Sequence, residues 1–189
     1  STLLQRMVNA VQRVRDRLAK ATAALAKANI AHAVVGGNAV ASWVATIDEG
    51  AVRNTQDVDI LIDRSNLQAV ITTLEAVGFT YRHVGGLDVL LDGPTAKPRD
   101  AIHLVFAGER VKPGEPFEIP LTSDSVDLGP FRVITLRALV QIKLTAFRDK
   151  DRTHLRDLIE VGLVDASWVP TLPSSIAPRL QQLLDTPGG

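Results

Sequence analysis

Two aspartates separated by one residue, Asp57 and Asp59, open an apolar run that continues to Ile62. Side chains alternate between the two faces of a β-strand, so these carboxylates are expected to lie on the same side. Like charges this close repel unless a cation compensates them, and Mg²⁺ prefers hard oxygen ligands of this kind. The pair therefore predicts a site for Mg²⁺ or Mn²⁺, although an isolated pair is also compatible with two solvated acids at the end of a strand.

A glycine pair, Gly36-Gly37, lies upstream between a short apolar run, 31–35, and a helix-forming segment, 38–45. Glycine lets the backbone approach an anion closely, and a helix N-terminus offers unpaired N–H donors. A tight strand-to-helix turn has the same need for glycine. Strand, glycine pair and helix follow one another in the order that a phosphate-binding turn requires.

The loop between this helix and the acidic strand carries Arg53 and Thr55. An arginine side chain presents a planar fork of donors that suits phosphate. Arg53 therefore either clamps a phosphate or pairs with Glu49 or Asp48 in the same loop. The whole segment predicts a site for a metal-bound nucleoside triphosphate.

A lysine, Lys143, stands in the apolar stretch 139–144. An unpaired ammonium group is costly in such a setting, so Lys143 is expected to meet an anion, either a triphosphate or Asp157. The other charged residues up to Asp157 are expected to form a solvated helix face with ion pairs three and four residues apart.

The elements that must position these residues follow from hydrophobic periodicity. Apolar residues at steps of three and four predict a long first helix. Ser65 is expected to cap a helix that runs to Val77, and Gly85-Gly86 is typical of a two-residue hairpin turn. Further strands are predicted at 31–35, 57–62, 79–84, 87–91 and 101–107, and further helices at 135–148, 151–161 and 174–184.

Strands dominate the first part of the chain after the long helix, and helices dominate the last part. This order predicts an α/β (α+β) fold with a mixed central sheet flanked by helices. We expect residues 1–134 to form the core and residues 135–189 to form a C-terminal helical lobe packed on it.

The composition narrows the classes of function. The 189 residues include 21 basic and 21 acidic side chains, so no large basic surface for a nucleic-acid backbone is expected. Cysteine is absent, which excludes disulfides and thiolate metal sites. Arginines interrupt the apolar residues of the first 33 positions, so no signal peptide or membrane span is expected there. A soluble cytoplasmic protein without a membrane partner is the expectation.

The motifs VVGGNAVASWV and RNTQDVDILI resemble those of the nucleotidyltransferase superfamily, which has the polymerase-beta-like fold. The resemblance covers about 33–107 and extends into KLTAFRDKDRTHLRDL, which is similar to a helical motif of AbiEii-type and minimal bacterial nucleotidyltransferases. It implies that Gly36 and Gly37 hold triphosphate oxygens, that Asp57 and Asp59 bind Mg²⁺, and that Lys143 approaches the nucleotide.

Two positions depart from the family pattern. Asn38 stands where the family commonly has serine, but its amide can still donate a hydrogen bond. His103 stands where the family usually has a third carboxylate. Imidazole is a poor ligand for Mg²⁺ and an acceptable one for Mn²⁺, and a neutral histidine can also act as a general base. A histidine that is hydrogen-bonded at the edge of the core is the structural alternative.

The resulting hypothesis is an enzyme that transfers a nucleoside monophosphate from a nucleoside triphosphate to an acceptor, with Mg²⁺ or Mn²⁺. The acceptor is a small molecule, a tRNA or a protein. One alternative, suggested by His103, is a nucleotidyltransferase fold that no longer catalyses transfer and acts as a binding or regulatory module. Another, implied by the AbiEii resemblance, is a toxin that modifies tRNA and has an antitoxin as its protein partner.

Overall fold

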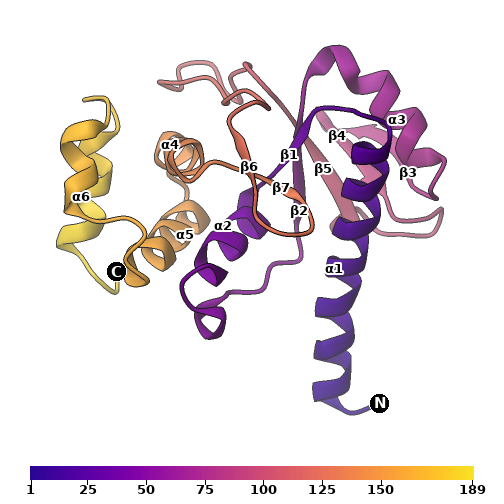
Figure 1. Cartoon of the computed structure of the whole chain (residues 1–189), viewed down its shortest axis with the longest axis horizontal. Helices are drawn as coiled ribbons and strands as arrows, with labels where there is room; N and C mark the ends of the chain where they lie inside the picture. The colour runs from indigo at the N-terminus through magenta and orange to yellow at the C-terminus, as the bar shows by residue number, and fades with distance from the viewer.

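A seven-stranded mixed sheet forms the centre of the computed structural model, which describes residues 1–189 (Figure 1). The strand order is β3-β4-β5-β2-β1-β7-β6. The strands are β1 His32–Val35, β2 Val58–Ile62, β3 Thr80–Val84, β4 Leu87–Leu91, β5 Ala101–Phe106, β6 Ser125–Asp127 and β7 Arg132–Ile134. The helices are α1 Leu3–Lys27, α2 Gly36–Ala45, α3 Leu67–Glu75, α4 Leu136–Ala146, α5 Asp149–Glu160 and α6 Ala177–Asp185. Short 3₁₀ helices occupy Glu49–Ala51, Arg64–Asn66, Pro98–Asp100 and Ala166–Thr171.

The strand directions bring three chain segments to one edge of the sheet. Strand β1 is antiparallel to β2, and β2 is parallel to β5. The end of β1 and the beginnings of β2 and β5 therefore meet at the same edge. The glycine pair and the acidic pair lie at this edge, and the mixed central sheet expected from the sequence is confirmed.

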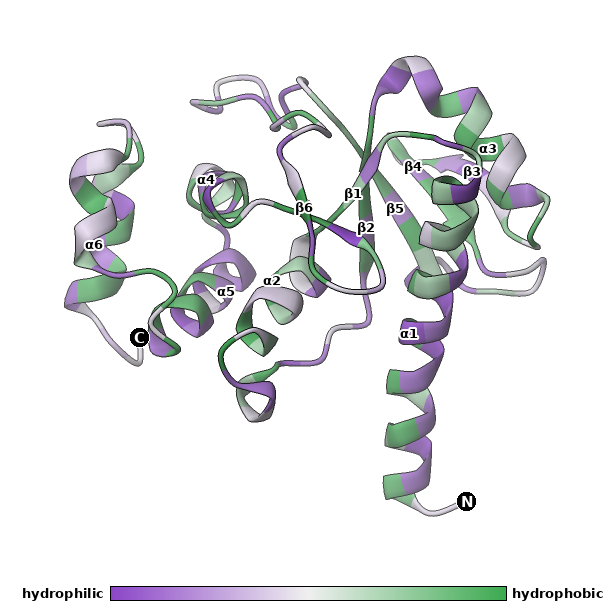
Figure 2. Ribbon diagram, in the orientation of Figure 1, coloured by the Kyte–Doolittle hydropathy of each residue, from purple (hydrophilic) through white to green (hydrophobic).

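Helices cover both faces of the sheet. Helix α2 lies against β1 and β2, and α4 and α5 pack against α2, whereas α1 and α3 lie together on the other side (Figure 1). The central strands are apolar on both faces because both are covered, and Ile60, Leu61 and Ile62 are fully buried. Figure 2 shows these strands as predominantly hydrophobic.

The glycine-rich hairpin is confirmed. Strands β3 and β4 are antiparallel and pair Val84 with Leu87. Both intervening residues, Gly85 and Gly86, have positive φ angles of 59° and 77°. This is the conformation that a two-residue turn with right-handed strand twist requires.

Several predicted boundaries differ from the structure. Helix α2 begins at Gly36, so the glycine pair belongs to its first turn and does not precede it. The helix expected to start after Ser65 begins at Leu67, because a 3₁₀ turn precedes it and no side chain caps it. The three-residue strands β6 and β7 were not predicted, since so short a segment carries no readable alternation.

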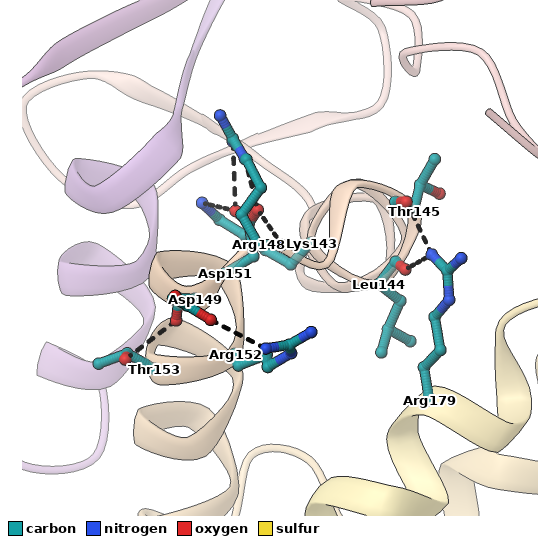
Figure 3. Close-up of polar contacts among 9 residues, drawn as sticks. All are labelled: Lys143, Leu144, Thr145, Arg148, Asp149, Asp151, Arg152, Thr153 and Arg179. Carbon is teal, nitrogen blue, oxygen red and sulfur yellow. Dashed lines mark hydrogen bonds and ion pairs between the residues drawn. The ribbon is translucent and has the colours of Figure 1, made fainter. Parts of the chain in front are cut away.

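The last three helices form the end of the chain. Helix α4 ends where Phe147 adopts a left-handed conformation, and α5 starts after Arg148. Arg179 of α6 donates hydrogen bonds to the carbonyls of Leu144 and Thr145 (2.7 and 2.8 Å), which ties α6 to α4 (Figure 3). No helix combines the length and the apolar character needed to cross a membrane.

Candidate nucleotide site

Gly36 and Asp59 lie in direct contact at the sheet edge. Gly36 has a positive φ of 68°, and a Cβ atom built on it would lie 2.2 Å from Oδ2 of Asp59. Val35 and Asp59 are register partners in β1 and β2, which explains the contact. Only glycine fits this position, because both its backbone conformation and its closeness to a carboxylate exclude a side chain.

The next two residues of α2 hold the loop that carries the acids. A Cβ atom on Gly37 would lie 3.0 Å from Thr55, so the loop packs directly on the helix backbone. Asn38 donates a hydrogen bond from Nδ2 to the Asp57 carbonyl (2.7 Å). The backbone N–H of Asp57 in turn donates to the hydroxyl of Thr55 (3.3 Å). One N–H of the Asn38 amide thus fixes the acidic loop, and the second N–H has no partner within the chain.

The two aspartates have different surroundings. Asp57 is exposed and precedes β2, whereas Asp59 is half-buried within the strand. Burial raises the pKa of Asp59; the neighbouring His103, Lys150 and Lys143 oppose that rise, and the charge of Asp57 adds to it. No side chain caps the N-terminus of α2, so backbone N–H donors remain there beside the carboxylate. A divalent cation would relieve the poorly compensated negative charge of Asp59.

His103 lies beside Asp59. The two are register partners in the parallel strands β2 and β5, so their side chains share one face of the sheet. The strand register therefore places His103 next to Asp59, as expected from the sequence. No three His, Asp or Glu side chains of the chain converge as a ready-made metal cluster. Any metal would take the two carboxylates as protein ligands and complete its shell with substrate oxygens and water.

Lys143 has a protein partner that the sequence did not indicate. Its ammonium group donates to Oδ1 of Asp151 (3.0 Å), and both residues are buried. Arg148 donates to the same carboxylate from its backbone N–H (3.0 Å) and from Nε (2.8 Å) (Figure 3). Burial lowers the pKa of Lys143, although Asp151 and Asp59 act in the opposite direction. The expected partner Asp157 is wrong, because the fold places Asp151 against Lys143.

Arg53 is likewise bound to a protein carboxylate. It donates to both carboxylate oxygens of Asp157 on α5, at 2.9 Å from Nε and 3.1 Å from Nη2. Neither Glu49 nor Asp48, the partners expected from the loop, pairs with it. This pair of hydrogen bonds joins the loop before the acidic strand to helix α5.

Lys150 is the cation that sequence reasoning missed. It is exposed, it makes no ion pair or hydrogen bond, and its positive charge opposes the rise in the pKa of Asp59 that burial causes. The sequence predicted two helices, 135–148 and 151–161, and placed the charged residues between Lys143 and Asp157, Lys150 included, on a solvated face. The break at Phe147 starts a new helix, α5, and α5 packs against α2. In the sequence, Lys150 lies seven residues before Asp157, on the same face of a helix. This spacing alone does not identify a nucleotide site.

His154 on α5 is also close to this group of charges. Burial lowers its pKa to about 4, and the neighbouring charge of Lys143 acts in the same direction, whereas Asp151 and Asp157 oppose it. Its Nδ1 atom is buried without a hydrogen-bond partner. His154 is therefore neutral near pH 7 and adds no charge to the site.

Comparison with known proteins gives a fold relationship. The sequence matches no family profile and no curated protein sequence. A solution structure of the antibiotic-resistance factor ANT(2'')-Ia is similar to this chain with a TM-score of 0.59 at 15% identity, covering 93% of this chain and 95% of that one. A crystal structure of ANT(2'')-Ia with adenylyl-2''-tobramycin gives a TM-score of 0.45 at 16% identity, covering 88% and 84%. The chain has the nucleotidyltransferase fold, in common with ANT(2'')-Ia.

Proposed function

We propose that this protein is a metal-dependent nucleotidyltransferase that transfers a nucleoside monophosphate from a nucleoside triphosphate to an acceptor. The observation that carries the proposal is the Asp59 carboxylate, which lies against Gly36 at the uncapped start of α2. A metal held by this carboxylate would lie next to helix N–H groups that can donate to phosphate oxygens. The shared fold of ANT(2'')-Ia supports a nucleotidyltransferase over other uses of such a site.

Asp57 and Asp59 are the residues that would hold Mg²⁺ or Mn²⁺. The bound ion would neutralise the triphosphate and orient its α-phosphate. The N–H groups at the start of α2 would receive phosphate oxygens, and Lys150 would contribute the free positive charge from α5. Lys143 would act at longer range through its field, because its ammonium group is held by Asp151.

In the transfer step, a hydroxyl oxygen of the acceptor attacks the α-phosphorus. The bond from that phosphorus to the bridging oxygen breaks, and pyrophosphate leaves. We assign His103 as the base that takes the hydroxyl proton, since it shares a sheet face with Asp59. With Mn²⁺, His103 is also an acceptable ligand, and the two roles exclude each other at one nitrogen.

The test is binding of a nucleoside triphosphate by calorimetry, with and without Mg²⁺ or Mn²⁺. The double variant Asp57→Ala plus Asp59→Ala is expected to abolish metal-dependent binding. An exposed acid far from the site, Glu75, supplies the matched control Glu75→Ala, which should bind normally. Unchanged binding in the double variant would contradict the site.

His103 motivates a second candidate, a module that binds nucleotide without transferring it. Incubation with each labelled nucleoside triphosphate, a metal ion and cell extract separates the two. Label in the small-molecule, tRNA or protein fraction would identify a transferase and its acceptor class. Tobramycin is a specific small acceptor to include, because ANT(2'')-Ia has been solved with adenylyl-2''-tobramycin. Label in tRNA would favour the AbiEii-like toxin hypothesis, and binding without label in any fraction would favour the module.

A further inference from the structure

Helix α5 faces the segment that carries the two acids at two separate points. Near its end, Asp157 accepts hydrogen bonds from Arg53 (2.9 and 3.1 Å). Near its start, Lys150 opposes the rise in the pKa of Asp59 that burial causes. The helix also packs against α2, whose first residue, Gly36, contacts Asp59. Residues 53–59 and helix α5 therefore run alongside each other in opposite directions.

The spacing of these two points on α5 links them. Lys150 and Asp157 are seven residues apart, so they lie on the same face of the helix, about 10 Å apart along its axis. The ion pair with Arg53 fixes one of the two points, whereas Lys150 has no ion pair or hydrogen bond of its own. A shift of α5 by one helical turn would move Lys150 by about 5.4 Å relative to the acids. Whether Lys150 can reach a phosphate bound beside Asp59 therefore depends on where Asp157 is held.

The chain between Arg53 and the acids has little freedom to absorb such a shift. Thr55 packs on the backbone of Gly37, 3.0 Å from where a Cβ atom would lie there. The hydroxyl of Thr55 accepts a hydrogen bond from the N–H of Asp57 (3.3 Å), and Asn38 donates to the Asp57 carbonyl (2.7 Å). Both backbone groups of Asp57 are therefore held, only four residues after Arg53. A displacement of Arg53 together with α5 would strain these contacts and turn the Asp57 carboxylate.

Arg53 is better suited to holding Asp157 than to binding a phosphate. The side chain of Asp157 is only 11% exposed, whereas that of Arg53 is 59% exposed. No other residue donates a hydrogen bond to the Asp157 carboxylate. Release of Arg53 to a phosphate would leave this largely buried carboxylate without a partner, which is strongly unfavourable. The nearby donors that remain free for a nucleotide are Lys150 and the second N–H of the Asn38 amide.

We propose that Arg53 and Asp157 are positioning residues for the nucleotide site and do not bind the nucleotide themselves. Their ion pair holds α5 in register with residues 53–59, so that Lys150 lies opposite the two acids. This role rests on the proposed function of the site, since it concerns the alignment of groups around a bound triphosphate. The planar guanidinium group makes both hydrogen bonds of the pair, so it restricts the orientation of the two segments as well as their distance.

Calorimetric titration with ATP, GTP, CTP and UTP in the presence of Mg²⁺ tests this role. Arg53→Gln and Asp157→Asn should each weaken nucleotide binding by about tenfold, because Lys150 and the acids are no longer aligned. The charge-swap variant, Arg53→Asp plus Asp157→Arg, restores the pair and should bring the affinity back towards that of the wild type. A phosphate-binding Arg53 predicts the reverse. Asp157→Asn would then free the arginine and tighten binding, and the charge-swap variant would bind more weakly than Arg53→Gln.

Hydrogen exchange in the ligand-free protein supplies a measurement that needs neither nucleotide nor metal. The backbone amides of residues 54–57 should exchange faster in Arg53→Gln and Asp157→Asn, and at the wild-type rate in the charge-swap variant. Arg64→Gln is the matched control, because Arg64 makes the same two-bond contact with Glu109 (2.7 and 2.9 Å) beyond the other end of β2 and is similarly exposed. This control should leave both nucleotide binding and the exchange of residues 54–57 unchanged.

Circular dichroism and a thermal melt show whether each variant is folded. If the charge-swap variant does not fold, Arg53→Lys replaces it. That variant keeps the charge but loses the planar fork, so its affinity should lie between those of the wild type and Arg53→Gln.

Normal or tighter binding in Asp157→Asn, or a charge-swap variant no better than either single variant, would overturn the proposal. Unchanged hydrogen exchange of residues 54–57 in both single variants would overturn it as well. A wild type that binds none of the four nucleotides would contradict the proposed function instead, and hydrogen exchange would still decide whether the pair holds the loop.

Discussion

The two sides of the candidate site are built by different physical means. The acidic side comprises Gly36, Gly37, Thr55, Asp57 and Asp59, and the basic side comprises Arg53, Lys143, Arg148 and Lys150. The acidic side is fixed by backbone conformation and by contacts too close to permit other residues. The basic side is fixed by ion pairs, in which Asp151 and Asp157 hold Lys143 and Arg53 and leave Lys150 free. Local sequence motifs therefore predict the contacts of the acidic side, whereas those of the basic side depend on distant segments.

The largest effect expected from this comparison is in Lys143→Met. Removing the ammonium leaves Asp151 buried with one partner fewer, so the free energy of unfolding should fall by about 3 kcal/mol, with nucleotide binding retained in the folded fraction. Urea denaturation measures the loss. Lys27→Met, on an exposed lysine, is the control. A stable variant that no longer binds nucleotide would show instead that Lys143 is a direct ligand.

The acidic side is tested by Gly36→Ala. The positive φ and the contact with Asp59 should together cost about 1–3 kcal/mol of stability and prevent nucleotide binding. In an Asp59→Ala background the same change should cost less, because the carboxylate is gone and only the backbone strain remains. A double-mutant cycle by denaturation measures the difference. An equal loss of stability in both backgrounds would mean that the contact between position 36 and Asp59 does not contribute to the destabilisation.

Lys150→Ala tests whether Lys150 is the cation that is available to bind the nucleotide. We expect nucleoside triphosphate affinity to fall by about tenfold, because an unpaired charge beside the phosphates is lost. Stability should change by less than about 0.5 kcal/mol, since Lys150 is exposed and makes no hydrogen bond or ion pair within the chain. Calorimetry measures the affinity, and Lys27→Ala is the matched control. An affinity equal to that of the control would remove Lys150 from the site.

Asp59→Asn tests the cost of the buried charge in metal-free protein. Burial raises the pKa of Asp59 above its ordinary value of 3.8, so the folded state binds the proton more tightly than the unfolded state. Ionisation therefore destabilises the wild type as pH rises through this window. The variant should be more stable than the wild type at pH 7, and the advantage should shrink below pH 4. Denaturation at both pH values measures it, and a constant difference would contradict the pKa shift.

The effect expected for His154→Leu appears only at acid pH. The pKa of His154 is lowered from 6.5 to about 4, so the unfolded state binds the proton more tightly. Wild-type stability should fall as pH decreases from 6.5 towards 4, and the variant should lack this contribution. Subtracting the two denaturation profiles isolates it. A difference that does not vary with pH would show that His154 is not buried as described.

Much of the acidic side and its scaffold could be predicted from the sequence, because the signals are local. A glycine pair after an apolar run, two acids at alternate positions and a glycine hairpin each constrain a few neighbouring residues. The resemblance to nucleotidyltransferases implied a place for His103 beside the acids, and the strand register agrees. Whether the site catalyses transfer stays a prediction, as do the domain division and the acceptor.

The ion-pair partners and the exposure of helix α1 depend on which distant segments of the chain meet, so only the tertiary structure decided them. The partners of Lys143 and Arg53 lie on α5, and the orientation of α5 follows from the left-handed turn at Phe147, which no pattern announces. The same holds for α1. Its apolar stripe is uniform in sequence, but the core covers only the second half, so the exposure of Leu4 and Met7 became visible only in the folded chain.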